Sequence, residues 1–234
     1  IGRLAERSLH AALKQELAQP GDQLEAALDG FVIDILRRDL LIEIQTRHLY
    51  AMRRKLTKLL TNHKVRLVHP IAAEKWILRV DANDRPIIRR KSPKRGQALD
   101  AFSELVRVPD LLAHPNFSLN VLLIGEEEVW RDDGLGSWRR HGWSRADRRL
   151  LHIVGEQIFT DPADYLALLP KGLAQPFTNK ELASAAACTT ALAQKVTYTL
   201  RGLNVQAECG RRGREHEFCT SQAGRAVSGP SAAL

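Results

Sequence analysis

The stretch DGFVIDILRRDLLIEIQTRH, residues 29–48, contains two apolar segments that meet across a short charged bend. Both have the character of β-strands, and we expect strands over roughly 24–36 and 40–46. Each carries a carboxylate in its middle, Asp34 in the first and Glu43 in the second. A two-residue loop at Arg38–Asp39 gives an antiparallel register that places Asp34 opposite Glu43. Because side chains alternate along a strand, Gln45 shares the face of Glu43.

Two carboxylates that face each other on a sheet repel, and partial burial increases the cost unless a cation neutralises them. A carboxylate pair beside an amide oxygen suits Mg²⁺, which commonly takes one or two carboxylates, several waters and substrate phosphates. Glu6 supplies a third acid, because residues 1–18 predict a helix with Glu6 in the middle of the stripe formed by Leu9, Leu13 and Leu17. The alternative is that Glu6 pairs with an arginine and that the strand acids lie on a solvated face.

The segments AER, GFVIDI and LLIEIQTR resemble the core of the PD-(D/E)XK nuclease superfamily, most closely its archaeal Holliday-junction resolvase branch. The resemblance covers roughly residues 1–72. It implies Glu6 as the helix acid, Asp34 and Glu43 as the strand acids, and all three as ligands of Mg²⁺ or Mn²⁺. Thr46 matches the hydroxyl residue that follows, and Gln45 stands where the superfamily has lysine. A neutral amide orients a water but supplies no positive charge to a developing phosphorane.

The composition favours a globular protein with a polyanionic partner. The chain has 234 residues, 44% of them hydrophobic, and a formal net charge of +8. We expect no membrane span and no signal peptide. The three cysteines, Cys188, Cys209 and Cys219, form no even disulfide framework, so we expect ordinary thiols and a cytoplasmic location.

Basic segments follow the predicted strands over 65–71, 74–80 and 87–97. The segment RRKSPKRG, residues 89–96, has a cation density suited to phosphate contacts, although a solvated loop is the alternative. The DNA contacts expected here are Arg89, Arg90, Lys91, Lys94 and Arg95.

We interpret the acidic run EEEVWRDD, residues 126–133, as a solvated strand end, because adjacent acids point to alternating faces. A basic amphipathic helix is predicted over 50–62, and further helix over 98–113.

The C-terminal part resembles the winged helix-turn-helix family. Thr178 and Glu181 predict a capping box, a helix over 191–203 follows, and residues 205–218 predict a hairpin with a Gly-Arg-Arg-Gly tip. In that family the second helix enters the major groove and the wing contacts the backbone. By match, the groove-facing residues are Thr189, Thr190, Gln194, Lys195 and Tyr198, and the phosphate contacts are Arg211, Arg212 and Arg214. A winged helix that binds protein is the alternative.

The sequence therefore predicts an α/β protein with a restriction-endonuclease-like mixed sheet flanked by helices and a small winged-helix domain. The expected parts are a nuclease-like domain over 1–168, a winged helix over 170–218 and a disordered tail over 219–234. The expected function is a metal-dependent DNA endonuclease that acts on duplex or branched DNA. The alternatives are a non-cleaving DNA-binding regulator and an enzyme acting on RNA. A homodimer is possible by analogy with resolvases.

Overall fold

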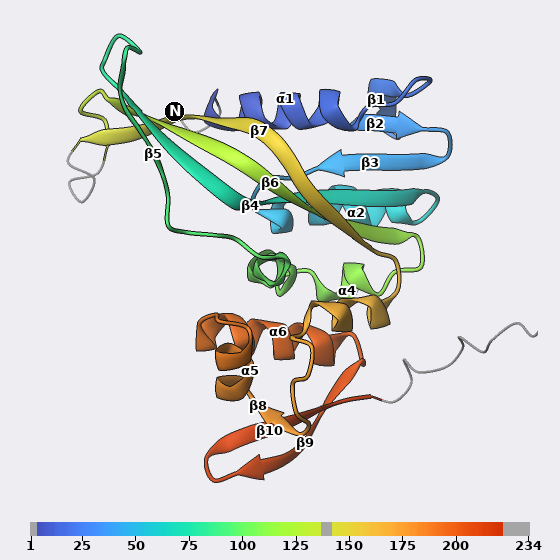
Figure 1. Cartoon of the computed structure of the whole chain (residues 1–234). Coiled ribbons are helices and arrows are strands. Elements are labelled where there is room, and N and C mark those ends of the chain that lie inside the picture. Colours follow the sequence, from blue (N-terminus) through green and yellow to red (C-terminus); the bar gives the residue numbers. More distant parts are fainter. Residues whose placement is uncertain (1–3, 137–141, 222–234) are drawn as a thin grey trace, which may run out of the picture.

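The structure is a computed structural model that describes residues 4–136 and 142–221, with side chains described from Ser8 on. It confirms the α/β class, because a large mixed sheet is flanked by helices on both faces (Figure 1). Among the described residues the sheet has seven strands, with the order β1-β2-β3-β4-β6-β7 and β5 paired to β4. None of the helices in this part of the chain has the length and apolar character needed to span a bilayer.

The first three strands form an antiparallel meander that contains the two predicted acids. β1 (Gln23–Leu28), β2 (Phe31–Arg37) and β3 (Leu40–Ile44) are consecutive neighbours. The register predicted across the Arg38–Asp39 bend is confirmed, because Arg37 pairs with Leu40 and Ile35 with Ile42. The single strand predicted over 24–36 is wrong, because the chain turns at Asp29–Gly30, where both residues have positive φ.

The centre of the sheet is parallel. After β3 the chain passes through η1 (Leu49–Met52) and α2 (Arg53–Leu60) and returns as β4 (Lys64–Val80), parallel to β3. β6 (Phe117–Asp132) is parallel to β4, and the edge strand β7 (Trp143–Phe159) is antiparallel to β6. β5 (Pro86–Lys91) pairs with the end of β4. The two strands predicted over 65–71 and 74–80 are one strand with an irregularity between Ala72 and Glu74.

Helices cover the two faces of the sheet. α1 (Leu4–Leu17) packs the buried Leu9 and Leu13 on one face, against side chains such as Ile42 and Ile44. The predicted leucine stripe of this helix is therefore confirmed. On the other face lie α2, η2 (Ala98–Ala101), α3 (Phe102–Leu105) and α4 (Pro109–Leu112), so the helix expected over 98–113 is present as three short pieces.

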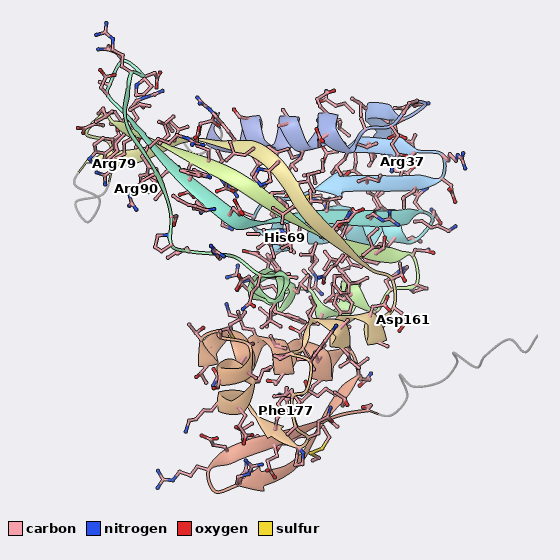
Figure 2. The ribbon with its side chains drawn as sticks, viewed as in Figure 1. Arg37, His69, Arg79, Arg90, Asp161 and Phe177 are labelled. Atoms are coloured by element: carbon pink, nitrogen blue, oxygen red, sulfur yellow. A yellow bond between two sulfur atoms is a disulfide. The ribbon has the colours of Figure 1, made fainter. Side chains whose placement is uncertain are left out.

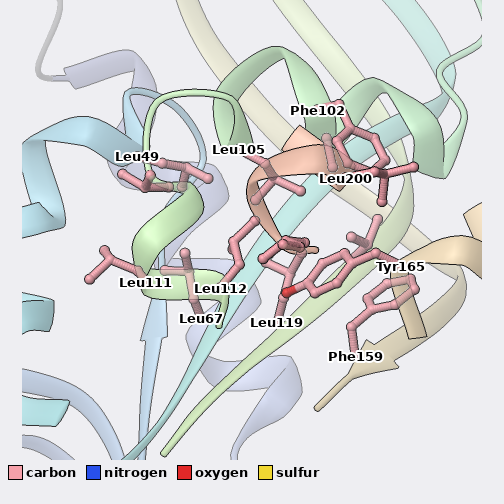
Figure 3. Packing of buried hydrophobic residues seen from close by; sticks show 14 of the residues in the cluster. Leu49, Leu67, Phe102, Leu105, Leu111, Leu112, Leu119, Phe159, Tyr165 and Leu200 are labelled. Carbon is pink, nitrogen blue, oxygen red and sulfur yellow. The ribbon is translucent and has the colours of Figure 1, made fainter. Parts of the chain in front are cut away.

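The C-terminal elements share a core with the second face. They are η4 (Pro162–Leu168), β8 (Phe177–Thr178), α5 (Asn179–Ala185), α6 (Thr190–Gly202), β9 (Gln206–Arg212) and β10 (Glu215–Thr220). Figure 3 shows Leu200 of α6 close to Phe102 and Leu105 of α3 in one cluster. The predicted capping box of Thr178 and Glu181 is confirmed, and Thr189 caps α6 through its hydroxyl.

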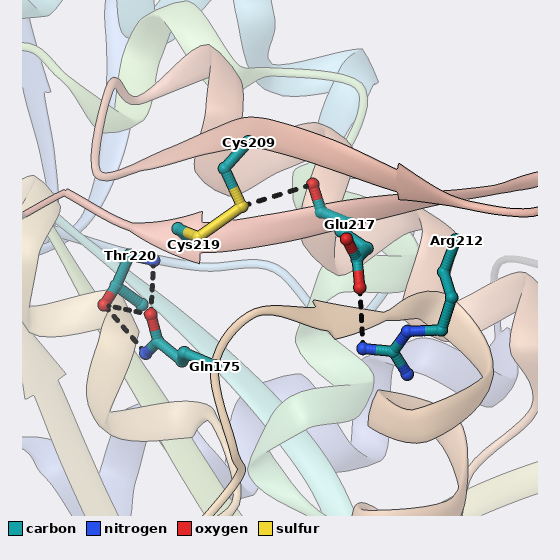
Figure 4. Close-up of a disulfide and its surroundings, with 6 residues drawn as sticks. All are labelled: Gln175, Cys209, Arg212, Glu217, Cys219 and Thr220. Atoms are coloured by element: carbon teal, nitrogen blue, oxygen red, sulfur yellow. Dashed lines mark hydrogen bonds and ion pairs between the residues drawn. A yellow bond between two sulfur atoms is a disulfide. The ribbon is translucent and has the colours of Figure 1, made fainter.

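The hairpin of β9 and β10 corrects the prediction for the cysteines. Cys209 and Cys219 form a disulfide across the two strands, and Cys188 is the free cysteine of the described residues (Figure 4). The pair was not expected because three cysteines form no even framework. Cys219 and Thr220, assigned to the tail, lie in β10, and residues 222–234 lie outside the described part of the chain.

Candidate functional site

Asp34 lies at the point where the ladder between β2 and β3 ends. The last pair of that ladder is Ile35 with Ile42, and beyond it the Asp34 carboxylate takes the place of a backbone partner. Its Oδ2 accepts a hydrogen bond from the Ile44 N–H at 2.9 Å and lies 3.1 Å from His10 Nε2. Lys14 Nζ lies 3.5 Å from Oδ1. The carboxylate is therefore fixed by β3 on one side and by two basic side chains of α1 on the other.

Glu43 is buried in β3 and faces α2. Its side chain is 4% exposed, and Lys55 Nζ lies 2.6 Å from Oε1. The same ammonium group donates to the Val32 carbonyl at 2.6 Å. Oε1 has no well-directed hydrogen bond among the described residues, although it is buried. Glu43 therefore keeps a charged neighbour and an oxygen with unused acceptor capacity.

The environments of the two acids shift their pKa values in opposite directions. Burial raises the pKa of Asp34, but the His10 ring, the Ile44 N–H and the Lys14 charge outweigh it and hold the pKa below its usual value. Burial also raises the pKa of Glu43, and here it outweighs the Lys55 ion pair, so the pKa stands above its usual value. The Asp34 charge adds to that rise, which shows that the two carboxylates are electrostatically coupled.

The other two predicted catalytic residues are placed differently. Glu6 belongs to α1, but its side chain lies outside the described residues. Gln45 follows the end of β3, and its side-chain amide donates to the Arg47 carbonyl. Its own carbonyl lies 2.8 Å from Nδ1 of the buried His69, whose pKa is lowered by burial. In this arrangement the Gln45 amide holds the chain that leaves β3.

The donor set fits a divalent cation in part. Asp34 and Glu43 present hard carboxylate oxygens on adjacent strands, and Oε1 of Glu43 has Lys55 as its charged neighbour but no well-directed hydrogen bond. No group of three or more His, Cys, Asp or Glu side chains with metal-binding geometry occurs in the described part of the chain. With described side chains alone, a cation at this point has two carboxylates and depends on water and phosphate for its remaining ligands.

The acidic run of β6 is not a solvated strand end, so that interpretation is wrong. Glu126, Glu127 and Glu128 are all buried, because β4 and β7 pair with β6 on both sides of them. Arg148 of β7 donates to Glu126 from Nε at 3.1 Å and from a second nitrogen. Lys75 Nζ lies 3.0 Å from Glu128. These acids serve an ion-pair network inside the long strands.

The predicted phosphate contacts of the basic segment divide into two groups. Arg89 is paired with Glu127 at 2.7 Å, and Lys91 with Glu74 at 3.3 Å. Figure 2 places Arg90 near Arg79, at the end of the sheet where β5 lies. Lys94 and Arg95 line a pocket of about 580 Å³ together with Thr189. The structure thus joins two predicted DNA-binding segments that are far apart in the sequence.

The predicted contacts of α6 and the hairpin are mostly exposed. Gln194 and Tyr198 are exposed on α6, with Thr189 and Thr190 at its start, and Lys195 is half-buried. Arg211 and Arg214 are exposed at the hairpin. Arg212 is engaged by Glu181 and by Glu217 at 2.6 Å, which Figure 4 shows for Glu217.

Comparisons with known proteins place most of this sheet in one family. A domain of unknown function, DUF8091, matches residues 7–160. The chain belongs to the DUF8091 family. An uncharacterized protein of Treponema pallidum (strain Nichols) is similar as well, with 32% identity over 181 residues that cover 77% of this chain and 69% of the relative. No solved structure gives a significant match.

The DUF8091 domain contains Asp34 and Glu43 together with three partners that the sequence did not reveal as a site. Lys14 and His10 approach from α1, and Lys55 from α2. The spacing of Glu6, His10 and Lys14 was a usable signal, because side chains four residues apart lie on one helix face. No local pattern marks Lys55, whose contact with Glu43 depends on how α2 crosses the sheet.

Proposed function

We propose that the DUF8091 domain of this protein is a metal-dependent deoxyribonuclease that hydrolyses phosphodiester bonds. The supporting observation is that two adjacent strands carry the half-buried Asp34 and the buried Glu43, each beside a lysine: Lys14 lies 3.5 Å from Asp34 and Lys55 2.6 Å from Glu43. Acids are costly in a sheet interior, and two carboxylates on adjacent strands are the type of group that holds a cation against a phosphate.

The resemblance to the PD-(D/E)XK superfamily supports this proposal through the order of its residues. A helix, a strand aspartate and a glutamate on the next strand follow one another as in that superfamily. The lysine of the family motif is replaced by Gln45, which supplies no charge. Lys55 brings an ammonium group to the same glutamate from α2, so we assign to Lys55 the role of the missing lysine.

The chemistry divides between a cation and the side chains. A bound Mg²⁺ or Mn²⁺ supplies Lewis acidity and an activated water. Asp34, with its depressed pKa, stays ionised and keeps its ligand charge at neutral pH. Lys55 stabilises negative charge that develops on the phosphate, and it favours the ionised form of Glu43 against the larger opposing effect of burial. His10 and Lys14 fix the orientation of Asp34.

The C-terminal elements support DNA binding in this proposal. α5, a short turn, α6 and the β9–β10 hairpin follow the order of a winged helix-turn-helix. Tyr198 and Gln194 are exposed on the second helix, and Arg211 and Arg214 on the wing. We assign groove contacts to the helix and phosphate contacts to the wing.

Cleavage of labelled duplex, branched and single-stranded DNA with Mg²⁺ or Mn²⁺ tests the proposal. Wild type is expected to cut at least one of these substrates, and Asp34→Asn to lose this activity. Lys55→Met is expected to lower kcat on the order of 10²-fold, because it removes a preorganised charge. Lys64→Met is the control, since this exposed lysine pairs with Asp39 at the start of β4. Equal kcat for the two lysine variants would contradict the role of Lys55.

A non-cleaving DNA-binding regulator is the second candidate, and one observation favours it. Lys14 and Lys55 already place a positive charge beside each of the two acids without a metal. If that is their final role, wild type cuts no DNA with either metal but still binds it. Gln45→Lys separates the candidates further, because cutting by this variant alone identifies a disabled nuclease site.

A further inference from the structure

The solvent side of η1 and α2 carries an aromatic, Tyr50 of η1, and two cations of α2 that none of the roles above uses. Leu56, Leu59 and Leu60 bury one side of the helix. On the other side Tyr50, Arg54 and Lys58 follow at intervals of four residues and line one groove of about 690 Å³. Tyr50 is 58% exposed. We call these three residues the Tyr50 surface.

The cations of the Tyr50 surface are available to a ligand. Within the described part of the chain, Arg54 has no hydrogen bond and no ion pair. Lys58 donates to the Asp29 carbonyl at 3.2 Å and lies 5.3 Å from the centre of the Phe31 ring, neither of which neutralises its charge. Arg53 in the same groove differs, because Asp110 pairs with it at 2.8 Å.

Arg54 and Lys58 of the Tyr50 surface lie on α2 together with Lys55, and Tyr50 lies in η1 directly before it. Lys55 reaches from α2 to Glu43 and to the Val32 carbonyl of β2. Val32 itself is 61% exposed, so an apolar side chain flanks this side of the helix. Arg54 and Lys55 are consecutive in α2, so a strand that contacts Arg54 passes within about one helical turn of the lysine beside Glu43.

We propose that the Tyr50 surface binds unpaired nucleotides, with a base stacked on Tyr50 and neighbouring phosphates on Arg54 and Lys58. An exposed aromatic among unpaired cations is the combination that binds single strands without reading sequence. A stacked base must be out of the duplex, so the surface selects DNA with a single-stranded segment next to the cleaved bond. This inference rests on the proposed function for its ligand class.

Fluorescence anisotropy with the full chain and EDTA tests the inference without cleavage. The probes are a labelled oligothymidylate of about 12 nucleotides and a blunt duplex of the same length. Tyr50→Ala is expected to weaken oligothymidylate binding on the order of tenfold and to leave duplex binding within about twofold. Tyr50→Phe keeps the ring and is expected to bind as wild type does. Leu135→Ala is the control for the loss of an exposed apolar side chain away from this surface, because Leu135 is 67% exposed, and it is expected to bind as wild type does.

Three results overturn the inference. Wild type that binds no oligothymidylate excludes the ligand, and unchanged affinity in Tyr50→Ala excludes stacking. If Arg54→Ala weakens oligothymidylate and heparin equally while Tyr50→Ala changes neither, the surface attracts polyanions by charge alone. Cleavage is measured separately with metal present. A protein that cuts DNA but whose oligothymidylate binding does not depend on Tyr50 contradicts this inference and leaves the proposed nuclease function intact. A protein that binds oligothymidylate through Tyr50 but cuts no DNA contradicts the proposed nuclease function and leaves this inference intact.

Discussion

Asp34 and Glu43 are neighbouring acids with opposite electrostatic preferences. Two basic side chains of α1 and a backbone N–H favour the ionised form of Asp34, whereas burial makes ionisation of Glu43 costly. In many active sites the surroundings of two acids separate their pKa values, so that one acid stays ionised while the other can gain or lose a proton. A structural ion-pair network also creates them, so the difference supports a site and does not define its reaction.

Replacement of Asp34 tests this electrostatic arrangement through stability. Asp34→Asn is expected to lower the free energy of unfolding at pH 7 by about 1–3 kcal/mol, because charge-assisted hydrogen bonds are lost. The folded-state pKa is depressed, so the stabilisation is complete above the unfolded value of about 3.9 and disappears as the pH falls through the folded pKa. Urea unfolding of wild type and variant at pH 7 and in steps below pH 4 measures this difference.

Glu43→Gln is the comparison for that series. The folded pKa of Glu43 is raised, so its ionisation costs stability above the folded pKa, and the cost disappears as the pH falls toward the unfolded value of about 4.3. Glu43→Gln should therefore cost less stability at pH 7 than Asp34→Asn does. Two variants with the same pH profile would show that the acids do not differ in this way.

The long strands depend on a buried ion pair at the level of the element. Glu126 is fully buried, and Arg148, which donates to it, is almost so. Glu126→Gln should destabilise the protein by about 3–5 kcal/mol, because it leaves a buried guanidinium without its charge partner. The double variant Glu126→Gln/Arg148→Met should regain much of this loss. Thermal unfolding that shows no loss in the single variant would contradict the burial of this pair.

The β9–β10 hairpin leads to a prediction for the three cysteines. Thiol titration of the denatured, unreduced protein should find one thiol, from Cys188, and three after reduction. Closing a loop of this size typically stabilises a protein by about 2–3 kcal/mol, so reduction should lower the midpoint of thermal unfolding. Three thiols before reduction, in protein purified without reductant, would contradict the pairing.

The elements also show what local sequence signals predicted and what they did not. The bend at Arg38–Asp39 predicted the observed register of β2 and β3, and Thr178 predicted the observed N-cap of α5. The hairpin at Asp29–Gly30 was missed although Asp-Gly is a strong turn signal, because apolar residues continue on both sides of it. β4 was divided because Pro70 and charged residues interrupt its apolar pattern, whereas its central position between β3 and β6 holds it in one strand.

The candidate site required the whole molecule. The register of β2 and β3 was predictable because one turn fixes it, but the ladder ends at Ile35 and Ile42, so the turn does not fix how the Asp34 side chain lies relative to Glu43. Lys55 was not predictable, because its contact with Glu43 depends on the packing of α2 through Leu56, Leu59 and Leu60. The burial of Glu126 similarly depends on the pairing of β4 and β7 with β6.

At the same scale, the shared core decides how the DNA-binding proposal is tested. α6 packs on α3 and α4, so deleting the C-terminal elements exposes apolar side chains such as Phe102 and Leu105. Point variants of the intact chain avoid this. Arg211→Ala/Arg214→Ala should weaken duplex binding and reduce the salt slope by about 2, because two phosphate contacts are lost.

Arg212→Ala is the control for that measurement, since Glu181 and Glu217 already pair with this arginine. It should change duplex affinity and its salt dependence less than the double variant does. An unchanged salt slope in the double variant would remove the hairpin from the DNA interface and leave the pocket of Lys94, Arg95 and Thr189 as the site to test.

A Mn²⁺ soak of crystals, read by anomalous scattering, tests the central claim most directly. The claim is that Asp34 and Glu43 hold a divalent cation that a phosphate completes. It predicts a peak between the two carboxylates in wild type and none in Asp34→Asn/Glu43→Gln. A wild-type map without that peak, in which Lys14 and Lys55 keep their contacts to the acids, would contradict the claim and favour the non-cleaving regulator.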